Sequence, residues 1–174
     1  MKIVECAYQI VESDYGSVLI AECSTSKRVI AVYFVRDVED DIKELQETFP
    51  TVNFKNGICT NSGLVVDAIN RLEVSSEIPL HIKCETQFGK QVVDALQKIP
   101  KGETRTYSQI ARELGNPNAA RAVARVCSTN NIAYIIPCHR VIASNGAISG
   151  YRWGIEKKRE LLNAEGAIIS FAVM

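Results

Sequence analysis

The chain has 174 residues and a formal net charge of zero, with 47% hydrophobic and 23% charged residues, which is typical of a folded globular protein and excludes a disordered one. No apolar stretch approaches the roughly 20 residues of a membrane span, and the N-terminus lacks the basic and then apolar pattern of a signal peptide. We therefore expect a cytoplasmic protein with no membrane partner.

The N-terminal part has the pattern of strands followed by helices. Three segments rich in β-branched and aromatic residues lie at residues 2–11, 16–23 and 28–35. The short turns between them predict an antiparallel meander. Apolar spacing predicts helices over 37–49 and 60–73, and a short strand follows over 78–84. These elements predict a small α/β domain with an antiparallel sheet over residues 1–84, and nothing in it looks catalytic.

Beyond Cys84 the pattern becomes mostly helical. Apolar spacing and terminal residues predict helices over 86–100, within 101–116, over 117–131 and over 155–166. The second and third, joined by a tight turn with Gly115 as a helix stop and Pro117 as a first helical residue, outline a helix-turn-helix. A strand-like segment over 133–143 and a glycine-bearing loop over 144–154 follow. We expect a second, mostly helical domain over residues 85–174.

Charge is divided unevenly between the two parts. Residues 1–84 hold 8 basic and 13 acidic side chains, a net charge of −5, and residues 101–174 hold 10 and 5, a net charge of +5. On the helix predicted over 117–131, Arg121 and Arg125 share a face, and four alanines would let its backbone approach a bulky surface. This favours a phosphate-lined groove as the partner. The alternative is a core helix whose arginines are merely solvated.

The sequence IPCHRV, residues 136–141, places a nucleophile beside a base. The thiolate is the reactive form of cysteine, and an imidazole can take its proton. Neighbours in an extended segment point to opposite sides, so Cys138 and His139 need a turn or a bridging water to act together. Pro137 is consistent with such a turn, and an acid on the last helix would orient the histidine. An inert buried cysteine and a cysteine hydrolase remain alternatives.

The six cysteines are dispersed without a CxxC pair, which predicts free thiols rather than a disulfide framework. The chain has only two histidines, His81 and His139, far apart in sequence. We expect no metal and no other cofactor.

Residues 86–166 resemble the O6-alkylguanine-DNA alkyltransferases. The resemblance rests on KGETRTYSQIARELGNPNAARAVARVCSTNN, IPCHRVIASNGAISGYRWG and LLNAEG at the expected spacings. It implies an α+β fold, with a ribonuclease-H-like N-terminal domain and a helix-turn-helix catalytic domain. It also implies repair of O6-alkylguanine, and of O4-alkylthymine, in duplex DNA after the damaged base is flipped out through the minor groove.

The resemblance also assigns roles to individual residues. Cys138 would take the alkyl group in one irreversible step, and His139 would act as its base through a water, held by Glu165. Tyr107 would donate a proton to the leaving guanine and crowd the backbone phosphate. Arg121 would fill the space left in the base stack.

Further residues would support this chemistry. Ala120 and Arg125 would contact DNA, and Asn130 would tie the recognition helix to the active-site segment. The resemblance places Asn130 at the base pocket together with three other residues: Val141, Tyr151 and Arg152. The family pattern has a small residue where Arg152 stands, so access for bulky alkyl groups is in question.

Some relatives carry a zinc ion on two cysteines and two histidines in the N-terminal domain. Cys6 and Cys23 match the thiols, but Arg28 stands where one histidine is expected, so we predict no structural zinc. The expected partner is double-stranded DNA, bound by a monomer. The alternative function is a non-enzymatic relative that flags alkylated DNA, and the presence of Cys138 discriminates against it.

Overall fold

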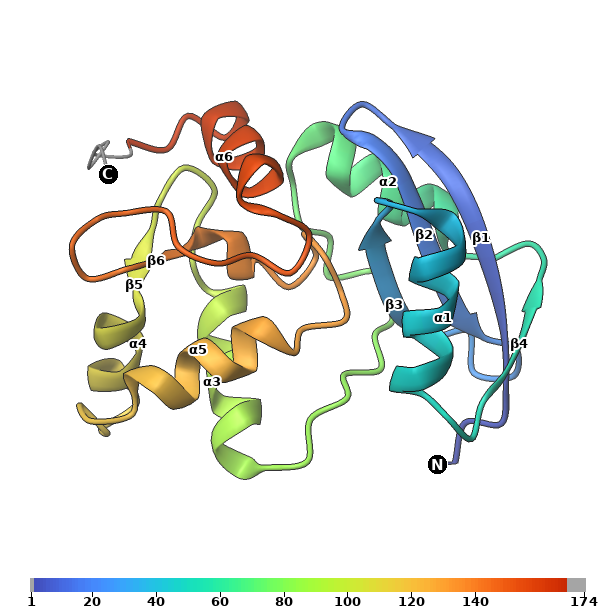
Figure 1. Cartoon of the computed structure of the whole chain (residues 1–174), viewed down its shortest axis with the longest axis horizontal. Coiled ribbons are helices and arrows are strands. Elements are labelled where there is room, and N and C mark those ends of the chain that lie inside the picture. Colours follow the sequence, from blue (N-terminus) through green and yellow to red (C-terminus); the bar gives the residue numbers. More distant parts are fainter. Residues whose placement is uncertain (1, 169–174) are drawn as a thin grey trace. The chain divides into compact units, whose positions relative to one another are not determined.

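A computed structural model describes residues 2–168 (Figure 1). The chain divides into two compact units. The first comprises Met1–Lys83 and Asn131–Ile135, and the second comprises Cys84–Asn130 and Ile136–Met174. The sequence alone assigned every residue after Cys84 to the second part, whereas five residues just before the Cys138 segment belong to the first unit. Among the described residues, no helix is long and apolar enough to cross a membrane.

The first unit is built on a four-stranded sheet with the order β3-β2-β1-β4. The strands are β1 (Glu5–Ser13), β2 (Gly16–Cys23), β3 (Val29–Phe34) and β4 (Asn53–Asn56). The first three form the predicted antiparallel meander, and β4 adds a parallel strand beside β1. β2 and β3 are almost wholly buried, so these two strands form the core of the unit.

Two helices complete this unit. Helix α1 (Val38–Thr48) begins at Asp37, whose side chain accepts a hydrogen bond from the backbone of Asp40. Helix α2 (Ser62–Arg71) begins against the sheet, because the buried carboxylate of Glu22 accepts hydrogen bonds from the backbone N–H groups of Thr60 and Asn61, both at 2.8 Å. Such a carboxylate stabilises a helix N-terminus by meeting donors that the helix itself leaves unpaired.

In the described part of the second unit there are four α-helices, α3 (Gln87–Gln97), α4 (Tyr107–Glu113), α5 (Ala120–Ser128) and α6 (Ile155–Ala164). A capping box of Thr106 and Gln109 starts α4. Gly115, with φ at 77°, ends it, and Asn116 N–H donates to the Ala111 carbonyl in a Schellman arrangement. The α+β class is confirmed, and α4 and α5 form the predicted helix pair.

A short parallel pair, β5 (Arg105–Thr106) and β6 (Val141–Ile142), lies beside a 3-10 turn at Cys138–Arg140, labelled η1. Three expectations were wrong in detail. The segment 78–84 forms only a single bridge, between Leu80 and Val29, since Pro79 has no N–H to donate. Helix α5 starts at Ala120 and not at Pro117, because residues 116–119 close a turn first. The segment 133–143 is mostly turn rather than strand.

Candidate active site

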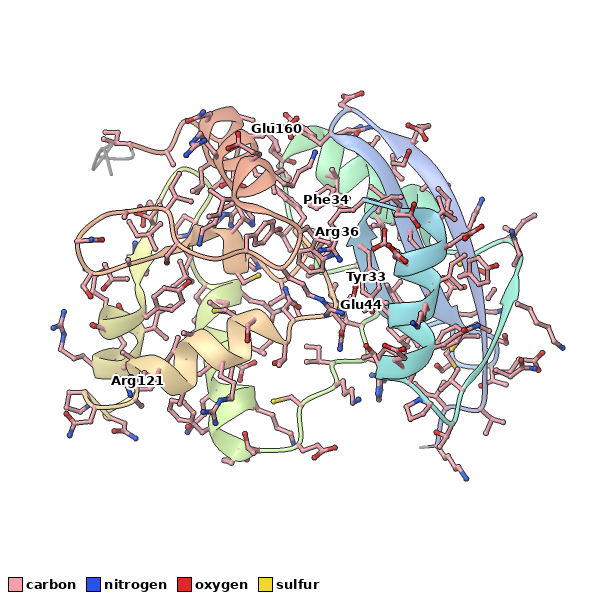
Figure 2. All side chains as sticks on the ribbon, in the orientation of Figure 1. Tyr33, Phe34, Arg36, Glu44, Arg121 and Glu160 are labelled. Atoms are coloured by element: carbon pink, nitrogen blue, oxygen red, sulfur yellow. The ribbon has the colours of Figure 1, made fainter. Side chains whose placement is uncertain are left out.

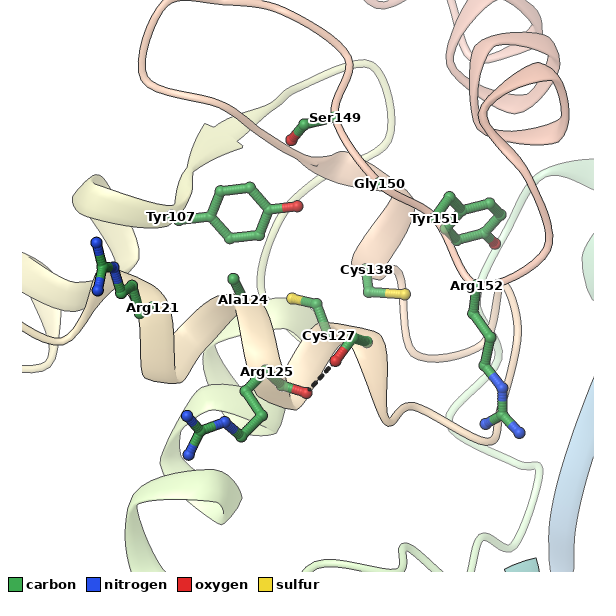
Figure 3. A pocket seen from close by; sticks show the side chains of 11 residues that line it. Tyr107, Arg121, Ala124, Arg125, Cys127, Cys138, Ser149, Gly150, Tyr151 and Arg152 are labelled. Atoms are coloured by element: carbon green, nitrogen blue, oxygen red, sulfur yellow. Dashed lines mark hydrogen bonds between the residues drawn. The ribbon is translucent and has the colours of Figure 1, made fainter.

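A pocket of about 610 Å³ opens in the second unit (Figure 3). It is enclosed by the start of α4, one face of α5, the turn η1 and the loop before α6. Its lining residues are Tyr107, Arg121, Ala124, Arg125, Cys127, Ser128, Cys138, Ser149, Gly150, Tyr151 and Arg152. The sequence-predicted residues that line it are therefore the nucleophile, the tyrosine, both helix arginines, Tyr151 and Arg152.

Cys138 is held at the base of the pocket by a fixed turn. Its backbone N–H donates to the Ile136 carbonyl at 2.8 Å, and Pro137 precedes it at φ −82°. The Asn130 amide donates to the Cys138 sulfur and to the Ile136 carbonyl, both at 3.2 Å. One amide therefore holds both the Cys138 sulfur and the backbone just before it. Asn130, at the end of the segment after α5, thus contacts the active-site turn as expected.

The Cys138 thiol is only 3% exposed. Burial raises its pKa, while the Asn130 hydrogen bond and the charges of Lys158 and Arg152 act in the opposite direction. The thiol is therefore protonated at rest, and its surroundings are arranged to stabilise the thiolate once a base removes the proton.

His139 lies in the same turn and is fully buried. Its Nε2 is 2.9 Å from Oε1 of Glu165, which lies just after α6. Arg140 holds the same carboxylate through two bonds, Nε to Oε2 at 3.0 Å and Nη2 to Oε1 at 2.7 Å. The remaining Arg140 amino group donates to the Ile99 carbonyl at 2.7 Å. Glu165 thus orients the histidine while Arg140 balances its charge.

These contacts define the protonation state of the group. Burial raises the pKa of Glu165, but hydrogen bonds from His139 and Arg140 outweigh it and lower the pKa to about 2. An ionised carboxylate only accepts hydrogen bonds, so His139 Nε2 carries the proton and Nδ1 is the acceptor nitrogen of the ring. Burial lowers the His139 pKa, against the effect of Glu165. The imidazole is therefore a neutral base at neutral pH.

Tyr107 begins α4 and points its hydroxyl into the pocket (Figure 3). Burial raises its pKa, and a hydrogen bond with Ser149 partly offsets that effect. A protonated phenol inside the pocket is suited to donate a hydrogen bond or a proton to a bound base.

The loop before α6 forms the opposite wall. The Tyr151 ring packs edge-on against Trp153, with centroids 5.2 Å apart, and the Arg152 guanidinium lies 5.5 Å from the Trp153 ring centroid. Arg152 also donates to the Asn130 carbonyl at 2.7 Å. Arg152 thus joins the loop to the segment after α5, and it is one of the residues that line the pocket.

The surface of α5 presents the DNA-facing candidates. Arg121 is exposed near the start of the helix (Figure 2), and Arg125 is exposed one turn later. Ala124 lies between them and lines the pocket, whereas Ala120, a predicted contact, is half-buried and does not line it. Small side chains beside two arginines leave the helix backbone accessible on this face.

Comparison with known proteins agrees with this geometry. Residues 87–167 match the family described as "6-O-methylguanine DNA methyltransferase, DNA binding domain". The methylated-DNA–protein-cysteine methyltransferase of Kluyveromyces lactis is 33% identical over 186 residues, covering 92% of this chain and 97% of that protein. The chain belongs to this methyltransferase family.

Two other family members are similar over most of the chain. The bifunctional transcriptional activator/DNA repair enzyme Ada of Escherichia coli is 38% identical over 161 residues, covering 91% of this chain but 45% of Ada. The chain thus spans about half the length of that relative. Mycobacterium tuberculosis OGT, in a crystal structure with DNA, is 30% identical with a TM-score of 0.73, and 92% of this chain matches 92% of it.

Sequence reasoning missed two buried residues of this site: Arg140, described above, and Lys158. The Lys158 side chain is fully buried, and its ammonium donates to the carbonyls of Val141 at 2.6 Å, Ser149 at 2.7 Å and Gly150 at 3.2 Å. Burial lowers its pKa to about 8. Lys158 therefore fixes the pocket loop to β6. Val141 was expected to line the pocket but does not. Its carbonyl instead accepts the hydrogen bond from Lys158.

A structural zinc ion takes four ligands, and the N-terminal residues do not fit such a site. Across residues 2–168, no group of three or more His, Cys, Asp or Glu side chains could hold a metal ion. The Arg28 guanidinium donates to the Leu80 carbonyl at 3.3 Å, next to His81. A permanent positive charge therefore lies where a histidine ligand would be needed.

Proposed function

We propose that this protein repairs O6-alkylguanine in duplex DNA by transferring the alkyl group to Cys138. The observation that supports the proposal best is the position of the Cys138 sulfur. It faces a pocket that is open between an arginine-bearing helix and an aromatic loop, and the adjacent imidazole is neutral and held by Glu165. The nucleophile and the arginine-bearing helix thus line one cavity, and the base lies in the same turn as the nucleophile.

The reaction balances with three side chains of the protein and one bridging water. The Cys138 proton passes to His139 through a bridging water, and the thiolate attacks the alkyl carbon. The carbon–oxygen bond breaks, and Tyr107 supplies a proton to the departing guanine. The product is a thioether, which water does not hydrolyse, so each molecule reacts once. O4-alkylthymine presents the same type of carbon–oxygen bond and is the second expected substrate.

A base inside a duplex cannot reach this pocket, so the damaged nucleotide has to rotate out of the stack. We infer that α5 enters the minor groove, because its small residues permit close approach and a single inserted side chain can hold the gap. Arg121 fills that gap and Arg125 contacts the backbone. We propose that the protein binds DNA as a monomer in the cytoplasm.

The test is intact mass after mixing with duplex DNA that contains O6-methylguanine. We expect one added methyl group, mapped to Cys138 and absent from Cys138→Ala. Repeated turnover without lasting modification would instead support a cysteine hydrolase. Tight binding with no transfer would support a non-enzymatic damage binder.

Base flipping is tested separately with Arg121→Ala. This variant should slow transfer from duplex DNA by at least tenfold while leaving the reaction with free O6-benzylguanine within about twofold, since a free base needs no flipping. Equal losses on both substrates would refute the proposed role of Arg121. Arg112→Ala, which removes an exposed arginine on α4, is the matched control for loss of one positive charge.

A further inference from the structure

Two of the buried cysteines in the first unit lie directly opposite each other. Cys6 on β1 and Cys23 on β2 are register partners in the antiparallel pair. Both are free thiols, and both are buried, at 0% and 1% exposure. Side chains of directly opposed residues project from the same face of a sheet, so these two thiols are immediate neighbours.

The hydrogen bonds show which type of pair this is. The Cys23 N–H donates to the Arg28 carbonyl at 2.9 Å, and the Cys23 carbonyl accepts from Lys27 N–H at 3.0 Å. The next bond toward β1 runs from Ser24 N–H to the Glu5 carbonyl at 3.0 Å. The backbone of Cys23 therefore faces away from Cys6, and the two form a non-hydrogen-bonded pair.

This pair type brings the two chains closest together. In such pairs the Cα atoms lie about 4.5 Å apart, which is inside the range of about 4.4 to 6.8 Å that disulfides span. The Cβ atoms of opposed residues are about 4.5 to 5.5 Å apart, against about 3.5 to 4.5 Å in a disulfide. A local approach of roughly 1 Å is therefore enough for a bond to form.

The third thiol of the unit lies on the other face of the sheet. Cys59 Sγ donates to the carbonyls of Ala7 and Ile20, both at 3.5 Å, and Cys59 N–H donates to the Gln9 side chain. Side chains alternate along a strand, so Gln9 projects opposite to Cys6. Cys59 is thus separated from the pair by the sheet itself, and Cys6 and Cys23 can pair only with each other.

We propose that Cys6 and Cys23 form a peroxide-reactive dithiol that closes into a cross-strand disulfide. The Cys23 thiolate attacks one oxygen of hydrogen peroxide, the O–O bond breaks, and hydroxide leaves, which gives a sulfenic acid at Cys23. Cys6 loses its proton and attacks that sulfur, and hydroxide departs as water. The two thiols are oxidised by two electrons and the peroxide is reduced to water.

The surroundings distinguish the two thiols. Burial raises the pKa of Cys23, but hydrogen bonds from Ser26 and Thr25 outweigh it and lower the pKa to about 7. Burial, reinforced by the Cys23 charge, raises the pKa of Cys6 to about 12. Cys23 directly precedes a turn over residues 24–28, whose residues are exposed or half-buried, whereas Cys6 lies within β1. Cys23 therefore attacks first and Cys6 resolves the sulfenic acid.

The decisive measurement is peptide mapping after peroxide treatment of the full chain. Cys138→Ser serves as the background, so that the repair nucleophile consumes no peroxide. We expect a Cys6–Cys23 cross-linked peptide, an intact mass lower by two hydrogens, and reversal by dithiothreitol. The oxidised form should melt about 5 to 10 °C above the reduced form, because the disulfide closes the β1–β2 hairpin.

Two variants control the result. Cys59→Ala should cross-link as the background does, whereas Cys6→Ala should stop with added oxygen on Cys23. Sulfinic acid at Cys23 with Cys6 still reduced in the Cys138→Ser background would overturn the proposal. So would cross-links to Cys59 or between molecules. These outcomes are independent of alkyl transfer, so they do not depend on the proposed repair function.

Discussion

Replacing Lys158 by methionine separates positioning of the pocket loop from stability of the fold. The change removes an ammonium that contacts three backbone carbonyls, at Val141, Ser149 and Gly150, while keeping a long side chain in the same space. Ser149 and Gly150 belong to the pocket wall, and Val141 is in β6. Without the ammonium, the loop has lost its link to β6.

Two opposing terms determine the effect on stability. A hydrogen bond from a charged donor contributes about 1.5 to 3 kcal/mol, but Gly150 is exposed and Ser149 is half-buried, so water replaces part of that loss. Burial lowers the Lys158 pKa from 10.5 to about 8, which corresponds to a cost of about 3 kcal/mol for keeping the charge inside. Methionine removes that cost. We expect the free energy of unfolding to change by less than about 2 kcal/mol.

The effect on reaction rate should be larger. A displacement of about 1 Å in a positioned group can cost about a hundredfold in rate. Single-turnover transfer at saturating DNA should therefore fall by about 10- to 100-fold, as measured by quenched-flow and mass spectrometry. Urea unfolding of the same samples gives the folded fraction. Lys157→Met, which removes the neighbouring charge and a surface ion pair with Glu160, is the control and should stay within about twofold of wild type.

The pH dependence provides an independent check. Between pH 8 and pH 10.5 an unfolded chain binds a proton at Lys158 that the folded chain does not, so stability contributed by this group rises with pH across that window. Wild type should gain stability relative to Lys158→Met as pH increases from 8 to 10. Parallel curves for the two proteins, or equal rates for Lys158→Met and Lys157→Met, would refute the role assigned to Lys158.

Three further predictions concern the same site. Because its folded pKa is lowered from 4.5 to about 2, Glu165 contributes about 3 kcal/mol that is lost as pH falls through that range; urea unfolding should show this slope in wild type and not in Glu165→Gln. Asn130→Ala should shift the rate–pH profile of transfer to higher pH, because a hydrogen bond that stabilises the thiolate is lost, and an unchanged profile would contradict this. Arg152→Ala should raise the rate with O6-benzylguanine relative to O6-methylguanine, and a constant ratio would show that Arg152 does not limit access.

Much of the fold follows from local sequence patterns. The strands of the meander either alternate between apolar and polar residues or are mostly apolar, and the turns between them are short. β1 to β3 could therefore be predicted. β4 could not be predicted, because three of the four residues in Asn53–Asn56 are polar and the strand lies at the sheet edge, where no apolar alternation is required. The predicted start of α5 was wrong because proline fits the first position of a helix. In the structure the Ala119 N–H donates a hydrogen bond to the Asn116 carbonyl, so residues 116–119 form a turn before the helix begins.

The candidate site was predictable where a residue type has a specific chemistry. Cys138, His139 and Glu165 were identified from the motif and the family resemblance, and the structure brings them together. Lys158 was missed because it lies in the run EKKRE, which looks like a solvated helix surface. Its neighbours behave that way, since Lys157 and Arg159 form exposed ion pairs.

A signal for Lys158 was nevertheless present in the spacing of α6. Lys158, Leu161, Leu162 and Glu165 follow the i, i+3, i+4, i+7 pattern of one helical face, and all four are buried. A charged residue in such a stripe is seldom accidental, because a buried charge requires a specific partner. In this stripe the Lys158 cation donates to backbone carbonyls of the pocket loop and β6, and the Glu165 anion is bound by His139 and Arg140.

In the proposed repair reaction each molecule reacts once, and the surroundings of Cys138 keep its thiol unreactive until a substrate is bound. Burial raises the Cys138 pKa and lowers the His139 pKa, so both groups are uncharged before DNA binds. A neutral thiol reacts slowly with electrophiles that reach it by chance. Asn130, Lys158 and Arg152 favour the thiolate, so their stabilisation takes effect as the proton leaves. We infer that deprotonation accompanies attack on a positioned alkyl carbon, which reserves the thiol for a base held in the pocket.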